Sequence, residues 1–235
     1  MFVVTAEALE HETCFEHARR AGLERLDTWG PQGGPAERTF GYRKSVPIEL
    51  VRWPRDHAEA AVAALFEGEA SSAADALVRG VTLRTTGLLA GWQERLRDYP
   101  AELAEARIEN AALTWGGYAP EGMLTITRPR ERLVLVERML DDANRVLQIV
   151  YALNRVWPPT TKRPALRLEG LAVKPERLAE RIEEALTEPD PFRALLVLNE
   201  LQLETVLLAP SGPYVDRARV WLPEVLEVLR EATPL

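Results

Sequence analysis

The sequence predicts an α+β protein in which a small mixed or antiparallel sheet precedes a predominantly helical bundle. Residues 1–5 are apolar and β-branched, which is typical of a buried strand. Apolar and polar residues alternate over 38–53 on either side of Lys44-Ser45, as in a β-hairpin. Most of the remaining chain has the three-four spacing of apolar residues that indicates helices. We therefore expect an α/β domain over residues 1–85 and a helical bundle domain over 86–235.

Shorter elements complete the first domain. A helix is expected over 6–22, ending at a glycine. The stretch 27–37 is rich in Gly and Pro and indicates a loop. An Ala-rich helix over 55–67 and a short helix over 71–79 then lead into the connector between the domains.

The second domain is expected to consist of six helices. Their predicted ranges are 88–98, 100–115, 129–157, 175–187, 190–209 and 213–231. Pro223 is expected to kink or split the last of them, because proline removes a helical hydrogen bond. In the 129–157 helix the three-four spacing predicts one continuous apolar face. That face consists of Leu133, Val136, Leu140, Ala143, Leu147, Val150 and Asn154.

Composition and charge exclude several classes of protein. Hydrophobic residues make up 46% and charged residues 28% of the 235 positions, which is typical of a globular protein without membrane-spanning segments. The net charge of −7 argues against broad nucleic-acid binding, which needs a basic face. The single Cys14 excludes an intrachain disulfide and a zinc site built on several cysteines, and a buried core position is the expected one. No secretory leader is recognised, so we expect a cytoplasmic protein.

One carboxylate in the predicted hairpin is a candidate for chemistry. Glu49 lies between Ile48 and Leu50, and strand alternation places it on the opposite face from both. It either points to solvent from a half-exposed sheet or binds a metal ion. Nucleotidyl transfer needs clustered carboxylates that hold Mg²⁺ against a triphosphate.

Several segments together resemble nucleotidyltransferase-fold proteins with an attached C-terminal helical domain of unknown function. The apolar-acid-apolar triplet Ile48-Glu49-Leu50 is similar to the element that carries the third metal-binding carboxylate in that family. The stretch 87–100 resembles the entry to the helical domain. The segment 153–162, which contains Leu-Asn-Arg, Trp-Pro and a lysine, resembles that domain's most recognisable motif.

The resemblance implies a partial nucleotidyltransferase palm that precedes the helical bundle. It implies NMP transfer from an NTP, with ATP and Mg²⁺ as the cofactors. Glu49 would be the catalytic, metal-binding carboxylate. Asn154, Arg155 and Lys162 would contact the nucleotide, Lys162 as a point charge for a phosphate.

The chain departs from the family pattern at its start. The Gly-Ser turn and the paired carboxylates (Asp-x-Asp) would fall just before or at Met1, so we expect a catalytically impaired or inactive site. One alternative is an active enzyme whose start is mis-assigned or whose site a partner chain completes. Another is a non-catalytic helical protein-interaction module. The exposed strand edge favours a homodimer or another covering partner.

Structural roles explain some of the same residues. Asn154 would pin neighbouring helices, and Lys162 would be favoured by the helix dipole. Asp141 and Asp142, beside Arg138 and Arg145, are expected to form solvated ion pairs on a helix surface.

Overall fold

The protein has the α+β architecture expected, in two compact units. Contacts within the chain divide it into Met1–Glu69, which contains the sheet, and Ala70–Leu235, which is helical. The division falls earlier along the chain than the sequence-based boundary at residue 85. The computed structural model describes residues 2–29, 37–68, 77–81, 87–115, 132–159 and 164–233.

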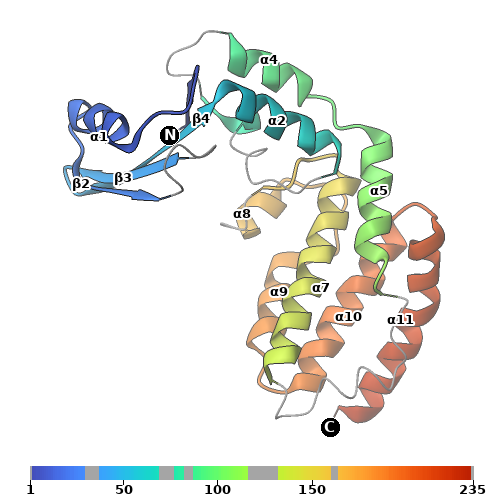
Figure 1. The fold of residues 1–235 in the computed structure, drawn as a ribbon. Coiled ribbons are helices and arrows are strands. Elements are labelled where there is room, and N and C mark those ends of the chain that lie inside the picture. Colours follow the sequence, from blue (N-terminus) through green and yellow to red (C-terminus); the bar gives the residue numbers. More distant parts are fainter. Residues whose placement is uncertain are drawn as a thin grey trace. The chain divides into compact units, whose positions relative to one another are not determined.

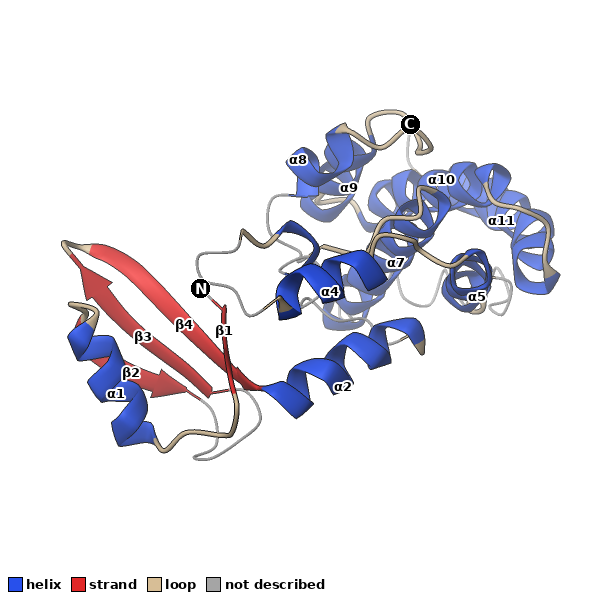
Figure 2. Cartoon of the chain, turned by 90° about the horizontal axis from the view of Figure 1, so that it is seen from above, coloured by secondary structure: helices blue, strands red, loops and turns tan. Residues whose placement is uncertain are grey.

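The first unit is built on a four-stranded mixed sheet. Its strands are β1 (Phe2–Thr5), β2 (Glu24–Trp29), β3 (Glu37–Arg43) and β4 (Val46–Pro54). They lie in the order β1-β4-β3-β2, with β1 parallel to β4 and the other pairs antiparallel (Figures 1 and 2). Strand β1 is therefore an edge strand that reaches its partner by a crossover.

The predicted hairpin is confirmed between β3 and β4. Lys44 and Ser45 form its two-residue turn, with φ of +49° and +66°. Positive φ at both positions is the geometry of a type I′ turn, whose twist matches that of the flanking strands. Glycine or asparagine would adopt it more easily, so the pairing of the two strands holds these residues in it.

Helix α1 (His11–Arg20) covers one face of the sheet (Figure 2). Ala18 of the helix packs with Leu23 and Leu50 in a buried cluster that Leu26 and Ile48 extend. On the same face, the buried guanidinium of Arg52 donates to Thr39 Oγ1 at 2.7 Å and to the carbonyl of Cys14 at 3.1 Å. The inner face thus contains an arginine whose charge is solvated by neutral oxygens.

Helix α2 (Arg55–Phe66) follows β4 directly. Pro54 ends the strand, and the ring of His57 in the first turn of the helix lies edge-on to Trp53, with 5.1 Å between ring centres. The helix buries Ala58, Val62 and Leu65. These three aliphatic residues therefore form the contact face of the Ala-rich segment.

The second unit is a bundle in which α10 packs against α7, α9 and α11, and α5 packs against α7 and α11. Leu195, Leu198 and Leu201 of α10 are fully buried at its centre. The helices described are α4 (Leu88–Arg95), α5 (Ala101–Ala112), α7 (Arg132–Leu153), α8 (Pro164–Glu169), α9 (Leu178–Thr187), α10 (Pro191–Leu208) and α11 (Pro213–Ala232) (Figure 1). In this described part, no helix combines the length and apolar character needed to cross a membrane.

The expected continuous apolar face of α7 is only half correct. Ala143 and Val150 are buried, but Leu133 is 80% exposed, and Val136 and Leu140 are exposed as well. In the N-terminal half of the helix, Leu135, Met139 and Asp142 are buried in their place. The buried row has the same seven-residue repeat as the predicted one but lies one position earlier in the chain, at Leu135, Met139, Asp142, Val146 and Ile149. The spacing therefore indicated a helix but did not decide which of two adjacent rows faces the core.

The expected break at Pro223 does not split the last helix. α11 continues from Pro213 to Ala232 with Pro223 inside it. Leu222, Val225 and Leu226, which flank the proline, are buried. Their packing offsets the one backbone hydrogen bond that proline removes.

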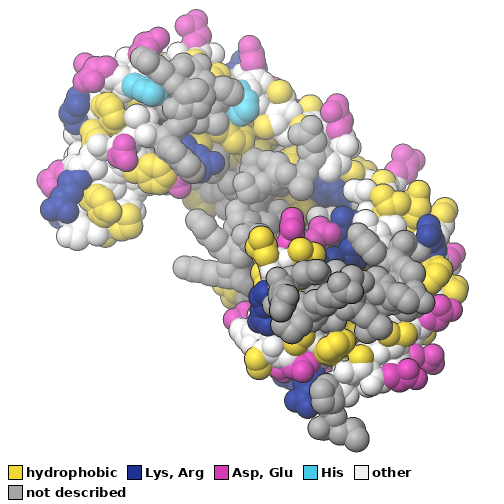
Figure 3. Space-filling model, turned by 60° about the horizontal axis from the view of Figure 1, so that its bottom comes forward, with side chains coloured by type: hydrophobic (Ala, Val, Ile, Leu, Met, Phe, Trp, Pro, Cys, Tyr) yellow, Lys and Arg dark blue, Asp and Glu magenta, His cyan; other side chains and the backbone are white. Residues whose placement is uncertain are grey.

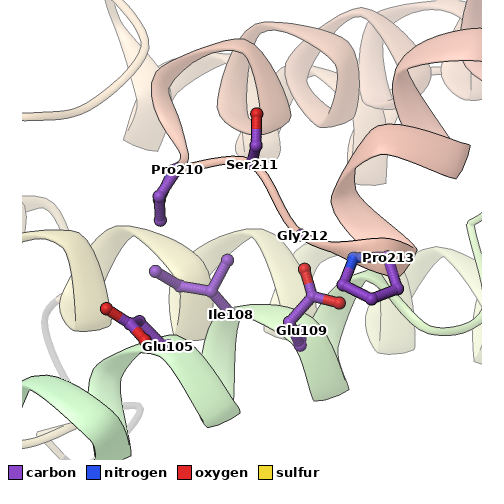
Figure 4. A pocket seen from close by; sticks show the side chains of 7 residues that line it. All are labelled: Glu105, Ile108, Glu109, Pro210, Ser211, Gly212 and Pro213. Carbon is purple, nitrogen blue, oxygen red and sulfur yellow. The ribbon is translucent and has the colours of Figure 1, made fainter.

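The start of α11 is capped by a side chain from another helix. Gly212 precedes the helix and has no side chain to serve as a cap. The carboxylate of Glu109 on α5 instead accepts from the backbone N–H of Tyr214 at 2.8 Å and of Val215 at 3.3 Å. Figure 4 shows this carboxylate beside Gly212, where it helps to line a pocket of about 280 Å³. A Cβ at Gly212 would collide with the carboxylate.

We predict that Gly212→Ala lowers the stability of the full chain by roughly 1–3 kcal/mol, because the new methyl group displaces the Glu109 cap. Urea unfolding followed by circular dichroism measures this change. Gly91→Ala in α4 is the matched control, since a Cβ there meets nothing within 4 Å. It should raise stability by about 0.5–1 kcal/mol. Equal effects of the two substitutions would contradict the steric argument.

Candidate functional site

Glu49 lies on the face of the sheet that α1 does not cover. Its neighbours along β4, Ile48 and Leu50, join the cluster under α1, so Glu49 points the other way. Its side chain is 37% exposed. Nη1 of Arg38 on β3 lies 3.4 Å from its Oε1, a half-exposed ion pair. Such a pair contributes little to stability and leaves the carboxylate accessible to a ligand.

The parallel pairing of β1 with β4 places Glu49 relative to the edge strand. Phe2 pairs with Val51 and Val3 with Arg52. Glu49 therefore lies on the strand next to β1, two residues before the paired segment begins at Val51.

Within the described ranges, no three His, Cys, Asp or Glu side chains lie close enough to hold a metal ion together. Mg²⁺ in proteins commonly takes one or two carboxylates and completes its octahedron with water and substrate phosphates.

The side-chain amide of Asn154 forms hydrogen bonds with backbone groups. Its Nδ2 donates to the carbonyl of Val173 at 2.7 Å and to that of Val150 at 2.8 Å. Its Oδ1 accepts from the N–H of Val173 at 3.0 Å. These bonds fasten the loop that precedes α9 to the end of α7. The sequence left two roles open for Asn154, a nucleotide contact and a link between segments of the bundle. These hydrogen bonds agree with the second role.

Arg155 and Lys162 are the other two predicted nucleotide contacts. Arg155 ends α7 in the left-handed conformation, with φ of +50°, and is exposed. The N–H of Val156 closes the helix end by donating to the carbonyl of Tyr151 at 2.9 Å. Lys162 lies outside the described residues. Glu49 belongs to the first unit, and Asn154 and Arg155 belong to the second.

The sequence analysis missed a buried carboxylate. Asp142 was expected in a solvated pair, but its side chain is fully buried. It accepts from Arg138 Nε at 2.8 Å and from Trp115 Nε1 at 3.0 Å. Asp141, whose side chain is 48% exposed, does form the expected surface pair with Arg145. Trp115 follows α5, and its hydrogen bond to Asp142 of α7 joins segments that are distant in the sequence. The spacing of residues within one helix does not predict such a contact.

Burial raises the pKa of Asp142, and the nearby Arg138 offsets only part of that effect. The desolvation cost of the ionised form explains the direction. The carboxylate connects the end of α5 to the middle of α7. We interpret it as a structural link.

A second buried cluster joins α5 to the end of α7. The guanidinium of Arg107 lies 5.6 Å from the ring centres of both Tyr99 and Trp157. Trp157 Nε1 donates to the carbonyl of Leu96 at 2.7 Å. Burial raises the pKa of Tyr99, with Arg107 acting in the opposite direction. Trp157, which belongs to the segment 153–162, is thus buried and bonded within the helical unit.

Charges of both signs are interspersed with hydrophobic side chains over the face shown in Figure 3. The described side chains on this face therefore do not gather into a patch with one sign of charge.

We predict that Asn154→Ala destabilises the full chain by roughly 1–3 kcal/mol, because two backbone groups of Val173 lose their partner. Arg155→Ala, which removes an exposed side chain, should change stability by less than about 0.5 kcal/mol. Chemical denaturation of both variants measures the difference. Unchanged stability of Asn154→Ala would show that these bonds do not hold the loop.

We predict a pH dependence from Asp142. Because its folded pKa is raised above 3.8, the folded state binds the proton more tightly than the unfolded state. The resulting stabilisation is fully present below the unfolded pKa and is lost as pH rises through the folded pKa. Unfolding free energies of the wild type and of Asp142→Asn, measured from roughly pH 4 to pH 8, isolate this contribution. The wild type should lose stability relative to the variant as pH rises, and the opposite slope would contradict the burial argument.

The final observation is comparative. No family model, no curated protein and no solved structure matches this chain. Glu49 and its neighbours on the sheet form the candidate site.

Proposed function

We propose that this chain is a nucleotidyltransferase-like protein that binds an NTP–Mg²⁺ complex at the face of its sheet opposite α1. Glu49 is the carboxylate that reaches the metal ion. The single observation that carries the proposal is the position of Glu49, one strand in from β1 and on the face opposite α1. The triplet Ile48-Glu49-Leu50, which resembles the element with the family's third carboxylate, supports the proposal at this position.

The chemistry of the site supports binding. A bound Mg²⁺ would neutralise phosphate charge and orient the phosphates, and Glu49 would hold one side of the ion. Arg38, which donates to the same carboxylate, adds a cation that phosphates attract. We propose binding without efficient NMP transfer, because Glu49 is the one carboxylate that the resemblance assigns to the metal ion.

A helical interaction module is the second candidate. The exposed row Leu133, Val136 and Leu140 on α7 favours it, because clustered apolar side chains on a helix surface often mark a contact. The internally satisfied amide of Asn154 agrees with a structural role for the predicted nucleotide motif. This candidate requires no small-molecule ligand.

We predict saturable binding of ATP to the full chain in a calorimetric titration that contains Mg²⁺. Glu49→Gln should weaken this binding by at least about tenfold, or about 1.4 kcal/mol, because the neutral amide is a poorer ligand for the ion. Without Mg²⁺ the variant and the wild type should bind ATP equally.

Glu16→Gln is the matched control, since Glu16 also forms a surface ion pair, with Arg20 at 3.0 Å, but lies on α1. It should bind ATP like the wild type. No heat at millimolar ATP would overturn the proposal and favour the interaction module. Metal-dependent NMP transfer that Glu49→Gln abolishes would show an active enzyme.

A further inference from the structure

The face of the sheet opposite α1 is exposed in part, and two aromatic side chains lie in the exposed part. Phe40 and Tyr42 of β3 are 37% and 44% exposed. They are two residues apart and therefore share a face. Gly41 between them lies toward α1, where it approaches the side chains of Leu23 and Leu26. A single exposed aromatic residue is ordinary, but two adjacent ones on a sheet provide a flat apolar surface.

Charged groups flank this surface in one cross-strand row. Phe40 pairs directly with Glu49 on β4 and with Asp27 on β2. Directly paired residues have Cβ atoms about 5 Å apart on the same face, so the ring lies between two carboxylates. Arg38, two residues before Phe40, donates to Glu49 at 3.4 Å. The row thus brings together an aromatic ring, a guanidinium and two carboxylates.

These groups complement the parts of a nucleotide. Aromatic side chains stack on bases, at roughly 1–3 kcal/mol per base. A guanidinium pairs with phosphate, and a carboxylate binds the Mg²⁺ that phosphates carry. The Asp27 carboxylate can accept hydrogen bonds from ribose hydroxyls or a base amino group. A peptide or lipid would not use all of these groups together.

We propose that Phe40 and Tyr42 form the base-stacking platform for the nucleotide whose Mg²⁺–phosphate end lies at Glu49 and Arg38. This inference rests on the proposed function and adds to it the orientation of the ligand. The base lies over β3, and the phosphates extend toward β4. Recognition of the base is then by stacking, which tolerates any base.

The test compares ligands with and without a base in calorimetric titrations of the full chain. The probes are ATP and inorganic tripolyphosphate, each with Mg²⁺, and adenosine alone. Phe40→Leu keeps an apolar side chain but removes the ring, and should weaken ATP binding roughly five- to hundredfold while leaving tripolyphosphate binding unchanged. Phe40→Trp should retain ATP affinity, which also shows that the position tolerates substitution. Tyr214→Ala, which removes an exposed aromatic residue from α11, is the control and should bind like the wild type.

The outcomes separate this inference from the proposed function. ATP binding that Phe40→Leu leaves unchanged but Glu49→Gln weakens would overturn the platform and retain the metal site. Adenosine binding that is lost in Phe40→Leu, without any tripolyphosphate binding by the wild type, would support the platform and overturn the metal site. If the wild type binds none of the three probes, both the stacking platform and the metal site are overturned.

Discussion

The strict alternation of β4 is the constraint on which the first unit depends. Leu50 and Arg52 turn inward, where one packs under α1 and the other bonds to Thr39 and to the backbone of α1. Glu49 consequently turns outward. A slip of one residue in register would bury a carboxylate and expose the core, so the same pairing that stabilises the sheet also fixes the candidate site.

The second unit is stabilised differently. Side chains of one segment form hydrogen bonds with backbone groups at the end of another segment. Helix ends leave several N–H and C=O groups without intrahelical partners. Arg219 of α11 donates to the carbonyls of Val206 and Ala209 at the end of α10. Asn154 does the same for the loop before α9, and Glu109 for the start of α11. The bundle is thus fixed at its ends as well as along its apolar contacts.

Local pattern predicted the α+β class, the hairpin at Lys44-Ser45 and the outward position of Glu49, because each follows from a period of two or from turn geometry. It did not predict the burial of Asp142, because the partner Trp115 is 27 residues away in sequence. The apolar face of α7 was wrong at Leu133 because two adjacent rows share one seven-residue repeat, and the row through Leu135 and Met139 is the buried one. For Asn154, residue type indicated a buried amide, but only the fold shows that Val173 is its partner.

The Glu109 cap has a consequence for how the bundle assembles. The N–H groups that it satisfies lie 105 and 106 residues further along the chain. A contact of such separation forms late, after the loop between has been closed. The first turn of α11 therefore gains its cap only when α5 has docked, and an isolated α11 peptide would fray at that end. The order of helices in the chain thus makes closure of the bundle a cooperative step.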